Sequence, residues 1–133
     1  MSASRTVITS PDAPAPGAYY SQAIASGDLL FCSGQIAIDP ATGQLVPGGI
    51  DAETERVFTN LKAVLAAAGA TLADVVKTTV YLSDFSEFAA MNAAYVRAFP
   101  TDPPARATVG VAALPRGAKI ELEAIARLRA PIP

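Results

Sequence analysis

The chain has 133 residues, 51% of them hydrophobic and 17% charged, which predicts a single domain spanning 1–133 that buries roughly two thirds of its unfolded surface. It contains no histidine, which excludes a serine or cysteine nucleophile with a histidine base and any histidine metal site. The formal net charge of -2 and the lack of any Lys/Arg cluster argue against a nucleic-acid partner, because neutralising phosphates needs a basic patch.

The first third of the chain predicts an irregular arm followed by short strands. Residues 10–18 (SPDAPAPGA) are Pro-rich and have neither a helical nor a strand pattern. Residues 28–38 (DLLFCSGQIAI) predict two strand segments that are broken at Ser33 and Gly34. Residues 39–49 (DPATGQLVPGG) are turn formers throughout.

The middle of the chain predicts a helix, a strand and a second helix. The first helix is expected at about 52–68, with Asp51 as its N-terminal cap and Gly69 at its C-terminal end. Residues 75–82 (VVKTTVYL) are β-branched and aromatic, which favours a strand. A second amphipathic helix is expected at about 86–99, and we interpret its apolar stripe as core packing.

The last third predicts a strand at about 106–113, a turn at 114–117 and a final strand over 117–128 (GAKIELEAIARL). The resulting order is two strands, a helix, a strand, a helix and two strands. This order predicts an α+β fold in two layers, with both helices on one face of a mixed sheet.

The final strand raises the question of what its carboxylates face. Side chains alternate along a strand, so Ile120 and Leu122 share one face with the alanines that follow, while Glu121 and Glu123 lie on the other. If the apolar row packs on the helices, the carboxylates point to the opposite face. That face is solvent in a monomer, but in an oligomer it can be a cleft between subunits.

The remaining composition signals concern compartment and assembly. No apolar run reaches the roughly 18 residues that span a bilayer, and the start of the sequence has no signal-peptide segment, so we expect a cytoplasmic protein with no membrane partner. The only cysteine, Cys32, lies in the apolar run LLFC, which is typical of a buried, inert thiol. The apolar excess favours a homo-oligomer.

Several blocks of the sequence resemble one family. They include SGQIAIDPATGQLVPGGI at 33–50 and PPARATVGVAALPRGAKIELEAIA at 103–126. The second block has an arginine after Pro-Ala and a glutamate after Ile on the following strand. In these blocks the sequence is similar to the RidA (YjgF/YER057c/UK114) family of enamine and imine deaminases.

The resemblance implies a chorismate-mutase-like subunit in a trimeric barrel, with ligand sites in clefts between adjacent subunits. It also implies hydrolysis of reactive intermediates of the 2-aminoacrylate and 2-iminobutanoate type to 2-keto acids and ammonia. The substrate would be a small carboxylate, and neither a cofactor nor a metal is implied. Fold alone does not determine function, so the site is considered residue by residue.

By resemblance, Arg106 binds the substrate carboxylate, for which a guanidinium can form a bidentate pair. Glu121 would place a water molecule and move protons, a role worth about 10² to 10⁴ in rate. Glu123 is interpreted as a structural or interface carboxylate, and Asn92 is expected to fix a loop.

The resemblance implies further substrate contacts from Tyr20, which would close over the ligand, and from Ser33 and Gly34, which would form a ligand-binding turn. Thr108 stands where many members have cysteine, and its backbone N–H would meet the carboxylate. The arm reads Ala-Tyr-Tyr-Ser-Gln at 18–22 instead of the family's usual Gly-Pro-Tyr-Ser-Gln. The altered arm sequence and the threonine at position 108 change polar groups of the expected pocket, and such groups set substrate preference.

Two other functions remain open from the sequence. A non-catalytic protein could use the same arginine to bind a keto acid as a signal. An endoribonuclease or translation inhibitor is the third possibility, but the lack of histidine and of a basic stripe disfavours it.

Overall fold

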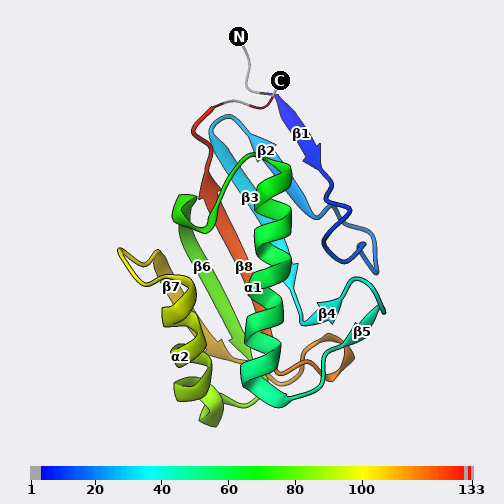
Figure 1. Ribbon diagram of the computed structural model, residues 1–133, viewed down its shortest axis with the longest axis vertical. Coiled ribbons are helices and arrows are strands. Elements are labelled where there is room, and N and C mark those ends of the chain that lie inside the picture. Colours follow the sequence, from blue (N-terminus) through cyan, green and yellow to red (C-terminus); the bar gives the residue numbers. More distant parts are fainter. Residues whose placement is uncertain (1–3, 131, 133) are drawn as a thin grey trace.

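The computed structural model describes residues 4–130 and 132, and its regular elements are arranged around one sheet (Figure 1). The strands are β1 (Arg5–Ile8), β2 (Ala23–Ser26), β3 (Leu29–Gln35), β4 (Ile38–Asp39), β5 (Gln44–Leu45), β6 (Val75–Leu82), β7 (Ala105–Gly110) and β8 (Ile120–Arg127). The helices are α1 (Gly49–Ala67) and α2 (Phe88–Ala98), with short 3₁₀ turns η1 (Leu72–Asp74), η2 (Phe85–Glu87) and η3 (Pro115–Gly117).

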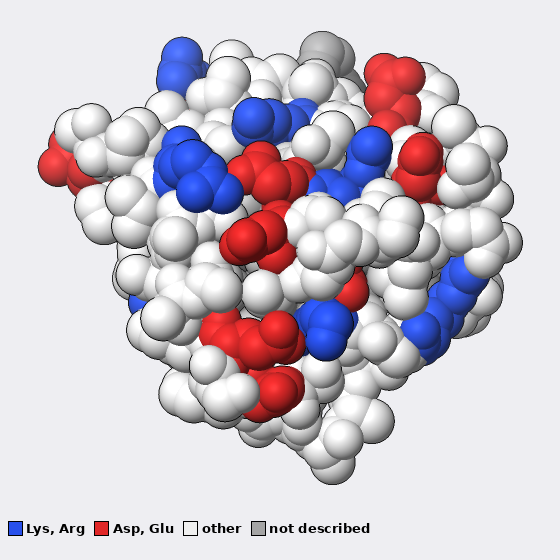
Figure 2. All heavy atoms as spheres, turned by 60° about the horizontal axis from the view of Figure 1, so that its bottom comes forward, with Lys and Arg blue, Asp and Glu red and all other residues white. Residues whose placement is uncertain are grey.

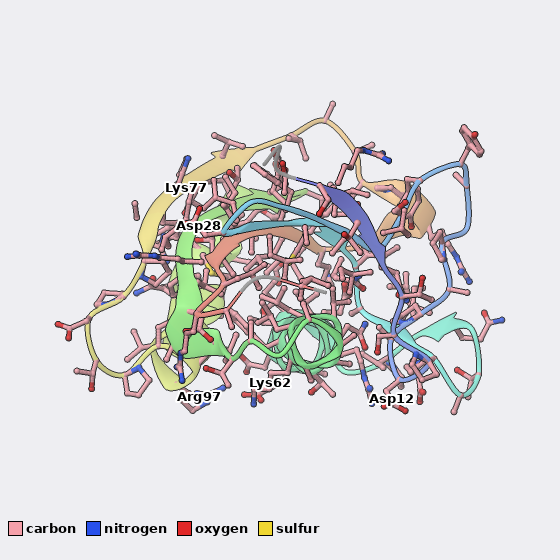
Figure 3. The ribbon with its side chains drawn as sticks, turned by 90° about the horizontal axis from the view of Figure 1, so that it is seen from above. Asp12, Asp28, Lys62, Lys77 and Arg97 are labelled. Atoms are coloured by element: carbon pink, nitrogen blue, oxygen red, sulfur yellow. The ribbon has the colours of Figure 1, made fainter. Side chains whose placement is uncertain are left out.

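The main sheet of the described chain has six strands in the order β1-β2-β3-β8-β6-β7. β6 and β7 are parallel and the other neighbours are antiparallel, so the sheet is mixed. α1 and α2 cover the same face of it, as Figure 1 shows and as the view from above in Figure 3 confirms for α1. The predicted α+β class and two-layer arrangement are therefore confirmed.

The core lies between this sheet and the helices. Ile120, Leu122, Ala124 and Ala126 of β8 are all buried, which confirms the predicted alternation of the last strand. The face of α1 that packs against β8 contributes four side chains that are also buried: Val57, Leu61, Val64 and Leu65. Complete burial of such side chains stabilises the fold by about 1.5–3 kcal/mol each.

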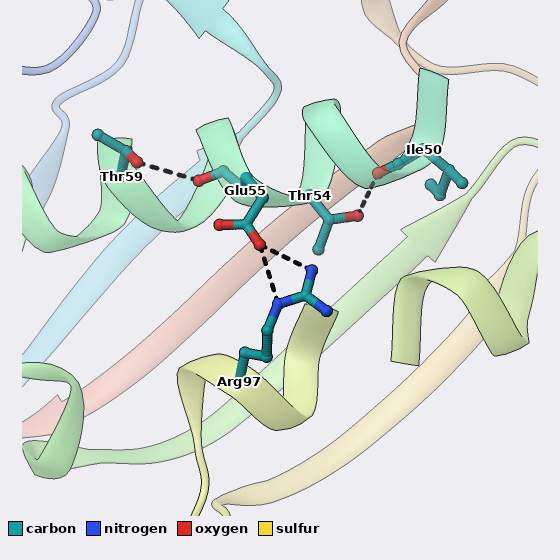
Figure 4. Close-up of polar contacts among 5 residues, drawn as sticks. All are labelled: Ile50, Thr54, Glu55, Thr59 and Arg97. Carbon is teal, nitrogen blue, oxygen red and sulfur yellow. Dashed lines mark hydrogen bonds and ion pairs between the residues drawn. The ribbon is translucent and has the colours of Figure 1, made fainter. Parts of the chain in front are cut away.

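The two helices meet through aromatic packing inside and an ion pair outside. Phe58 of α1 lies 5.7 Å from Tyr95 of α2, measured between ring centroids. At the surface, Arg97 Nη2 lies 2.8 Å from Glu55 Oε1 (Figure 4). That pair is more than half exposed on both sides and contributes at most about 1 kcal/mol.

Three expectations about local structure need correction. β1 and β2 were not expected; they are four-residue strands whose short patterns give little periodic signal. β3 is not broken at Ser33 and Gly34 but runs through them with a shift of register between Cys32 and Gln35. The N-terminal cap of α1 is Gly48, whose φ is 115°, and Asp51 lies inside the first turn of the helix.

Other local expectations are confirmed. Gly69 follows the last residues of α1 with φ 75°, the left-handed conformation that ends helices. Burial raises the pKa of the Cys32 thiol to about 12, so this cysteine is inert at neutral pH. In the described part of the chain, no helix is long and apolar enough to cross a membrane.

Asn60 on α1 ties the helix to the segment that follows β3. Its side chain is fully buried, and Nδ2 donates to the carbonyl oxygens of Ile36 at 3.3 Å and Ile38 at 2.9 Å.

We expect Asn60→Ala to lower the free energy of unfolding by about 2–3 kcal/mol, because the carbonyl oxygens of Ile36 and Ile38 lose their hydrogen-bond donor. Urea denaturation measures the change. The neighbouring exposed Thr59→Ala is the control and should stay within about 0.5 kcal/mol of wild type; equal values for both variants would contradict this role.

Candidate functional site

Four of the predicted site residues gather around one cavity of about 410 Å³. Tyr20 comes from the arm, the segment 9–22 between β1 and β2. Ser33 and Gly34 come from β3, and Glu121 comes from β8. The remaining lining residues are Ile36, Pro115 and Glu123. The cavity lies on the side of the sheet that the helices do not cover, because Glu121 and Glu123 alternate with the buried row of β8.

Gly34 lies directly against the carboxylate of Glu121. A Cβ atom at this position would come within 2.9 Å of the carboxylate carbon of Glu121, closer than real side chains approach. The register of β3 against β8 shifts at this point, between Cys32 and Gln35. With the Glu121 carboxylate in this position, residue 34 can carry a side chain only if Glu121 moves.

Ser33 and Gln22 hold the arm that carries Tyr20. Ser33 Oγ donates to the Ser21 carbonyl at 2.6 Å, and its N–H donates to the Gln22 carbonyl at 3.0 Å. The Gln22 side chain, only 3% exposed, donates to the Ser10 and Pro14 carbonyls and accepts from the Ser10 N–H. Tyr20 itself is half exposed at the mouth of the cavity.

Glu121 has a neighbour of the same charge in Glu123, two residues along the strand. Burial raises the pKa of the Glu121 carboxyl, and the charge of Glu123 raises it further. Glu123 in turn accepts a hydrogen bond from the hydroxyl of Tyr81, the β6 residue opposite Glu121, and this bond raises the pKa of Tyr81. Glu121 is thus a carboxyl group that holds a proton more tightly than usual, which suits general acid–base chemistry.

Arg106 is held against α2 rather than beside Glu121. Its Nη1 donates to Asn92 Oδ1 at 2.8 Å. Its guanidinium carbon lies 4.5 Å from the centre of the Tyr95 ring and 5.5 Å from that of Phe88. Stacking and this hydrogen bond fix the plane of the guanidinium, and most of its five N–H donors make no hydrogen bond to the described residues.

The expectation that Asn92 fixes a loop is wrong, since its side chain binds Arg106. Asn92 and Tyr95 lie three positions apart on α2, and that spacing places both on one helical face. This spacing was the available signal in the sequence for a pair that holds the arginine.

Thr108 lies on the same face of β7 as Arg106, two residues along the strand. Its side-chain oxygen is buried and has no hydrogen-bond partner among residues 4–130 and 132. A buried hydroxyl without a partner is uncommon and is available to a ligand or to a neighbouring chain.

The pairing of strands sets Arg106 and Glu121 on opposite faces of the sheet. Arg106 pairs with Thr78, which pairs with Ala124, so it lies on the face of the sheet that the helices cover. Glu121 pairs with Tyr81 on the other face. One chain therefore brings Tyr20, Ser33, Gly34 and Glu121 together, and it places Arg106 and Thr108 elsewhere.

Comparison with known proteins identifies the family of this chain. The family model described as "Endoribonuclease L-PSP" matches residues 10–128. A RutC family protein of Pyrococcus horikoshii is 50% identical over 92% of this chain and 97% of its own. A Rattus norvegicus protein named 2-iminobutanoate/2-iminopropanoate deaminase is 48% identical over 92% of this chain and 89% of its own.

Solved structures agree with this match. The crystal structure of E. coli TdcF with bound serine has a TM-score of 0.88 and 35% identity to this protein. The alignment covers 92% of this chain and 98% of TdcF. The fold, the family model and the identity of the relatives lead to one conclusion: the chain belongs to the RidA/YjgF family.

Proposed function

We propose that the protein hydrolyses small 2-imino acids, and the 2-aminoacrylate enamines that tautomerise to them, to 2-keto acids and ammonia. The observation that carries the proposal is the fixed guanidinium of Arg106, which Asn92 and Tyr95 hold with donors left over for a carboxylate. The deaminase name of the rat relative and the serine bound to TdcF support the same substrate class. We expect this activity in the cytoplasm, without a cofactor or metal.

We propose a homotrimer in which each site combines Arg106 of one subunit with Glu121 of the next. The two residues lie on opposite faces of one sheet, so a site that uses both must draw on two chains. The uncovered face also carries exposed apolar side chains: Val7 is 54%, Phe31 44% and Val109 41% exposed. Contact with a second subunit would remove this surface from water and so stabilise the assembly.

In the proposed reaction, Arg106 binds the substrate carboxylate and Glu121 moves protons. Glu121 takes a proton from a water molecule as the water oxygen adds to C2 of the imine, and it delivers this proton to the imine nitrogen. It then takes the hydroxyl proton of the resulting carbinolamine and passes it to the nitrogen as the C–N bond breaks, so ammonia leaves and C2 becomes the keto carbon. One water is consumed and one ammonia released, so no oxidant or reductant is required.

An endoribonuclease function, which the description of the family model suggests, fits this chain less well. The sequence has no histidine and a net charge of -2. On the face that Figure 2 shows, Lys and Arg are interspersed with acidic and uncharged atoms and do not form a continuous basic surface. Binding of RNA depends on such a surface.

Ammonia release in a coupled assay tests the proposal. An amino-acid oxidase or a serine dehydratase supplies the imine, and wild-type protein should accelerate the release of ammonia. Glu121→Gln should lower kcat by about 10² to 10⁴ because it removes the group that moves protons. The variant should still bind pyruvate in calorimetry, since Arg106 is intact. If the wild type binds pyruvate but releases no ammonia above background, the protein is a binding protein and the proposal is wrong.

The pH dependence tests whether Glu123 acts on Glu121. Glu123→Gln removes a negative charge that disfavours ionisation of Glu121, so the pKa of Glu121 should fall toward its ordinary value. The limb of the kcat/KM profile that reports Glu121 should therefore move to lower pH. The control, Glu55→Gln, removes an exposed carboxylate on α1 and should leave the profile in place. A limb that stays at the wild-type pH in Glu123→Gln would refute this effect.

A further inference from the structure

A second cavity, of about 510 Å³, opens beside the Glu121 cavity. It lies between the arm, the segment around β4, and η3; in Figure 1 the arm and η3 lie next to the β4–β5 hairpin. Four residues line both cavities: Tyr20, Gly34, Ile36 and Pro115. A molecule whose reacting atoms lie at Glu121 can therefore extend past Tyr20 and Ile36 into the second cavity.

The second cavity is lined mainly by apolar side chains. Pro14, Ala15 and Ala18 come from the arm, and Ile38 and Pro40 come from β4 and its flank. The cation at its edge, Arg116, already donates to the Gly43 carbonyl at 3.0 Å and approaches Gln44 Oε1 at 3.5 Å. An apolar group fits such a lining, whereas a second charged group would lose its hydration there.

Hydrogen bonds from two buried side chains hold the walls of this cavity in place. Gln22 Nε2 donates to the Pro14 carbonyl at 2.9 Å and so fixes the arm. Asn60 Nδ2 donates to the Ile36 and Ile38 carbonyls and so fixes the opposite wall. The cavity is therefore formed before any ligand enters, and preformed apolar pockets are typical of ligand sites.

We propose that this cavity receives the side chain of the substrate, and that the preferred substrates are 2-imino acids with aliphatic side chains of about four carbons, as in the imine of leucine. This inference rests on the proposed function, because it places the imine carbon at Glu121. The methyl group of 2-iminopropanoate is too short to extend from Glu121 far into a space of this size. A branched aliphatic side chain would remove much more apolar surface from water, and an enzyme converts that difference into selectivity.

The test compares imines that an amino-acid oxidase makes from leucine and from alanine. Wild type should show a kcat/KM at least roughly tenfold higher for the leucine-derived imine. Ala15→Phe and Ala18→Phe place a ring on the arm side of the cavity and should lower that ratio toward one. Ala41→Phe is the matched control: Ala41 is exposed in the β4–β5 loop and does not line the cavity, so its ratio should equal that of wild type.

The outcomes separate this inference from the proposed function. If wild type hydrolyses both imines with equal kcat/KM and neither phenylalanine variant changes the ratio, the side-chain cavity is refuted and the deaminase stands. If wild type hydrolyses neither imine, the proposed deaminase function is wrong, and calorimetry with the two keto acids still tests the cavity.

Tighter binding of 4-methyl-2-oxopentanoate than of pyruvate, lost in both phenylalanine variants, would support the side-chain cavity. Equal affinities for the two keto acids would overturn the side-chain cavity. Circular dichroism establishes that each variant is folded.

Discussion

Arg106→Ala is expected to reduce kcat/KM for imine hydrolysis by about 10² to 10⁴, because the variant would lose the two charge-assisted hydrogen bonds proposed between Arg106 and the substrate carboxylate. The fold should survive, since Arg106 is only half-buried on the edge strand β7. Binding of pyruvate should weaken by a similar factor. Ammonia release measures the first effect and calorimetry the second.

Arg106→Lys separates charge from geometry at the same position. Lysine keeps the positive charge, but it cannot form a bidentate pair with a carboxylate or stack its plane on Tyr95. We therefore expect a loss close to that of Arg106→Ala. Arg97→Ala is the matched control, because Arg97 is an exposed arginine on α2 whose partner is Glu55, and its activity should equal that of wild type. Wild-type activity in Arg106→Lys would show that a simple cation suffices and that the held guanidinium is not required.

The elements with strong periodic patterns were predictable from the sequence. The alternation of β8 placed Leu122 in the core and Glu121 on the other face, and the structure has both. The strands β1 and β2 were missed because each has four residues, too few for alternation to stand out. The cap of α1 was misassigned because Asp51 has the side chain of a cap. The helix in fact begins at Gly49, after a cap at Gly48 three residues before Asp51, and both glycines have positive φ.

Four of the residues singled out from the sequence line one cavity, but their arrangement was not predictable. Tyr20, Ser33, Gly34 and Glu121 meet because the register of β3 and β8 brings them together, and that register is not visible in either strand alone. The position of Arg106 depends on the parallel pairing of β7 with β6, which sets its face. Only the registers of β7 on β6 and of β6 on β8, taken together, show that Arg106 and Glu121 lie on opposite faces of the sheet.

That separation leads to a second large effect, which appears only in mixed oligomers. In the proposed composite site, Arg106→Ala and Glu121→Gln each remove one of the two partners, so each variant alone should be nearly inactive. If a trimer combines Arg106 of one subunit with Glu121 of the next, any trimer that contains both variants has one site with both residues intact. Trimers co-expressed with two affinity tags and purified through both should therefore recover about one third of wild-type activity.

The recovery depends on where the two residues meet, and so it tests the composite site directly. If Arg106 and Glu121 of the same chain formed a site, no mixed trimer would contain both residues in one place, and activity would stay at the level of the single variants. The control mixes the two purified variants without exchange of subunits and should show no recovery. Recovery in the control would point to contaminating enzyme, and its absence from both samples would refute a site shared between chains. Recovery confined to the co-expressed trimers requires that a carboxylate on the uncovered sheet face of one chain works with a guanidinium held beneath α2 of another.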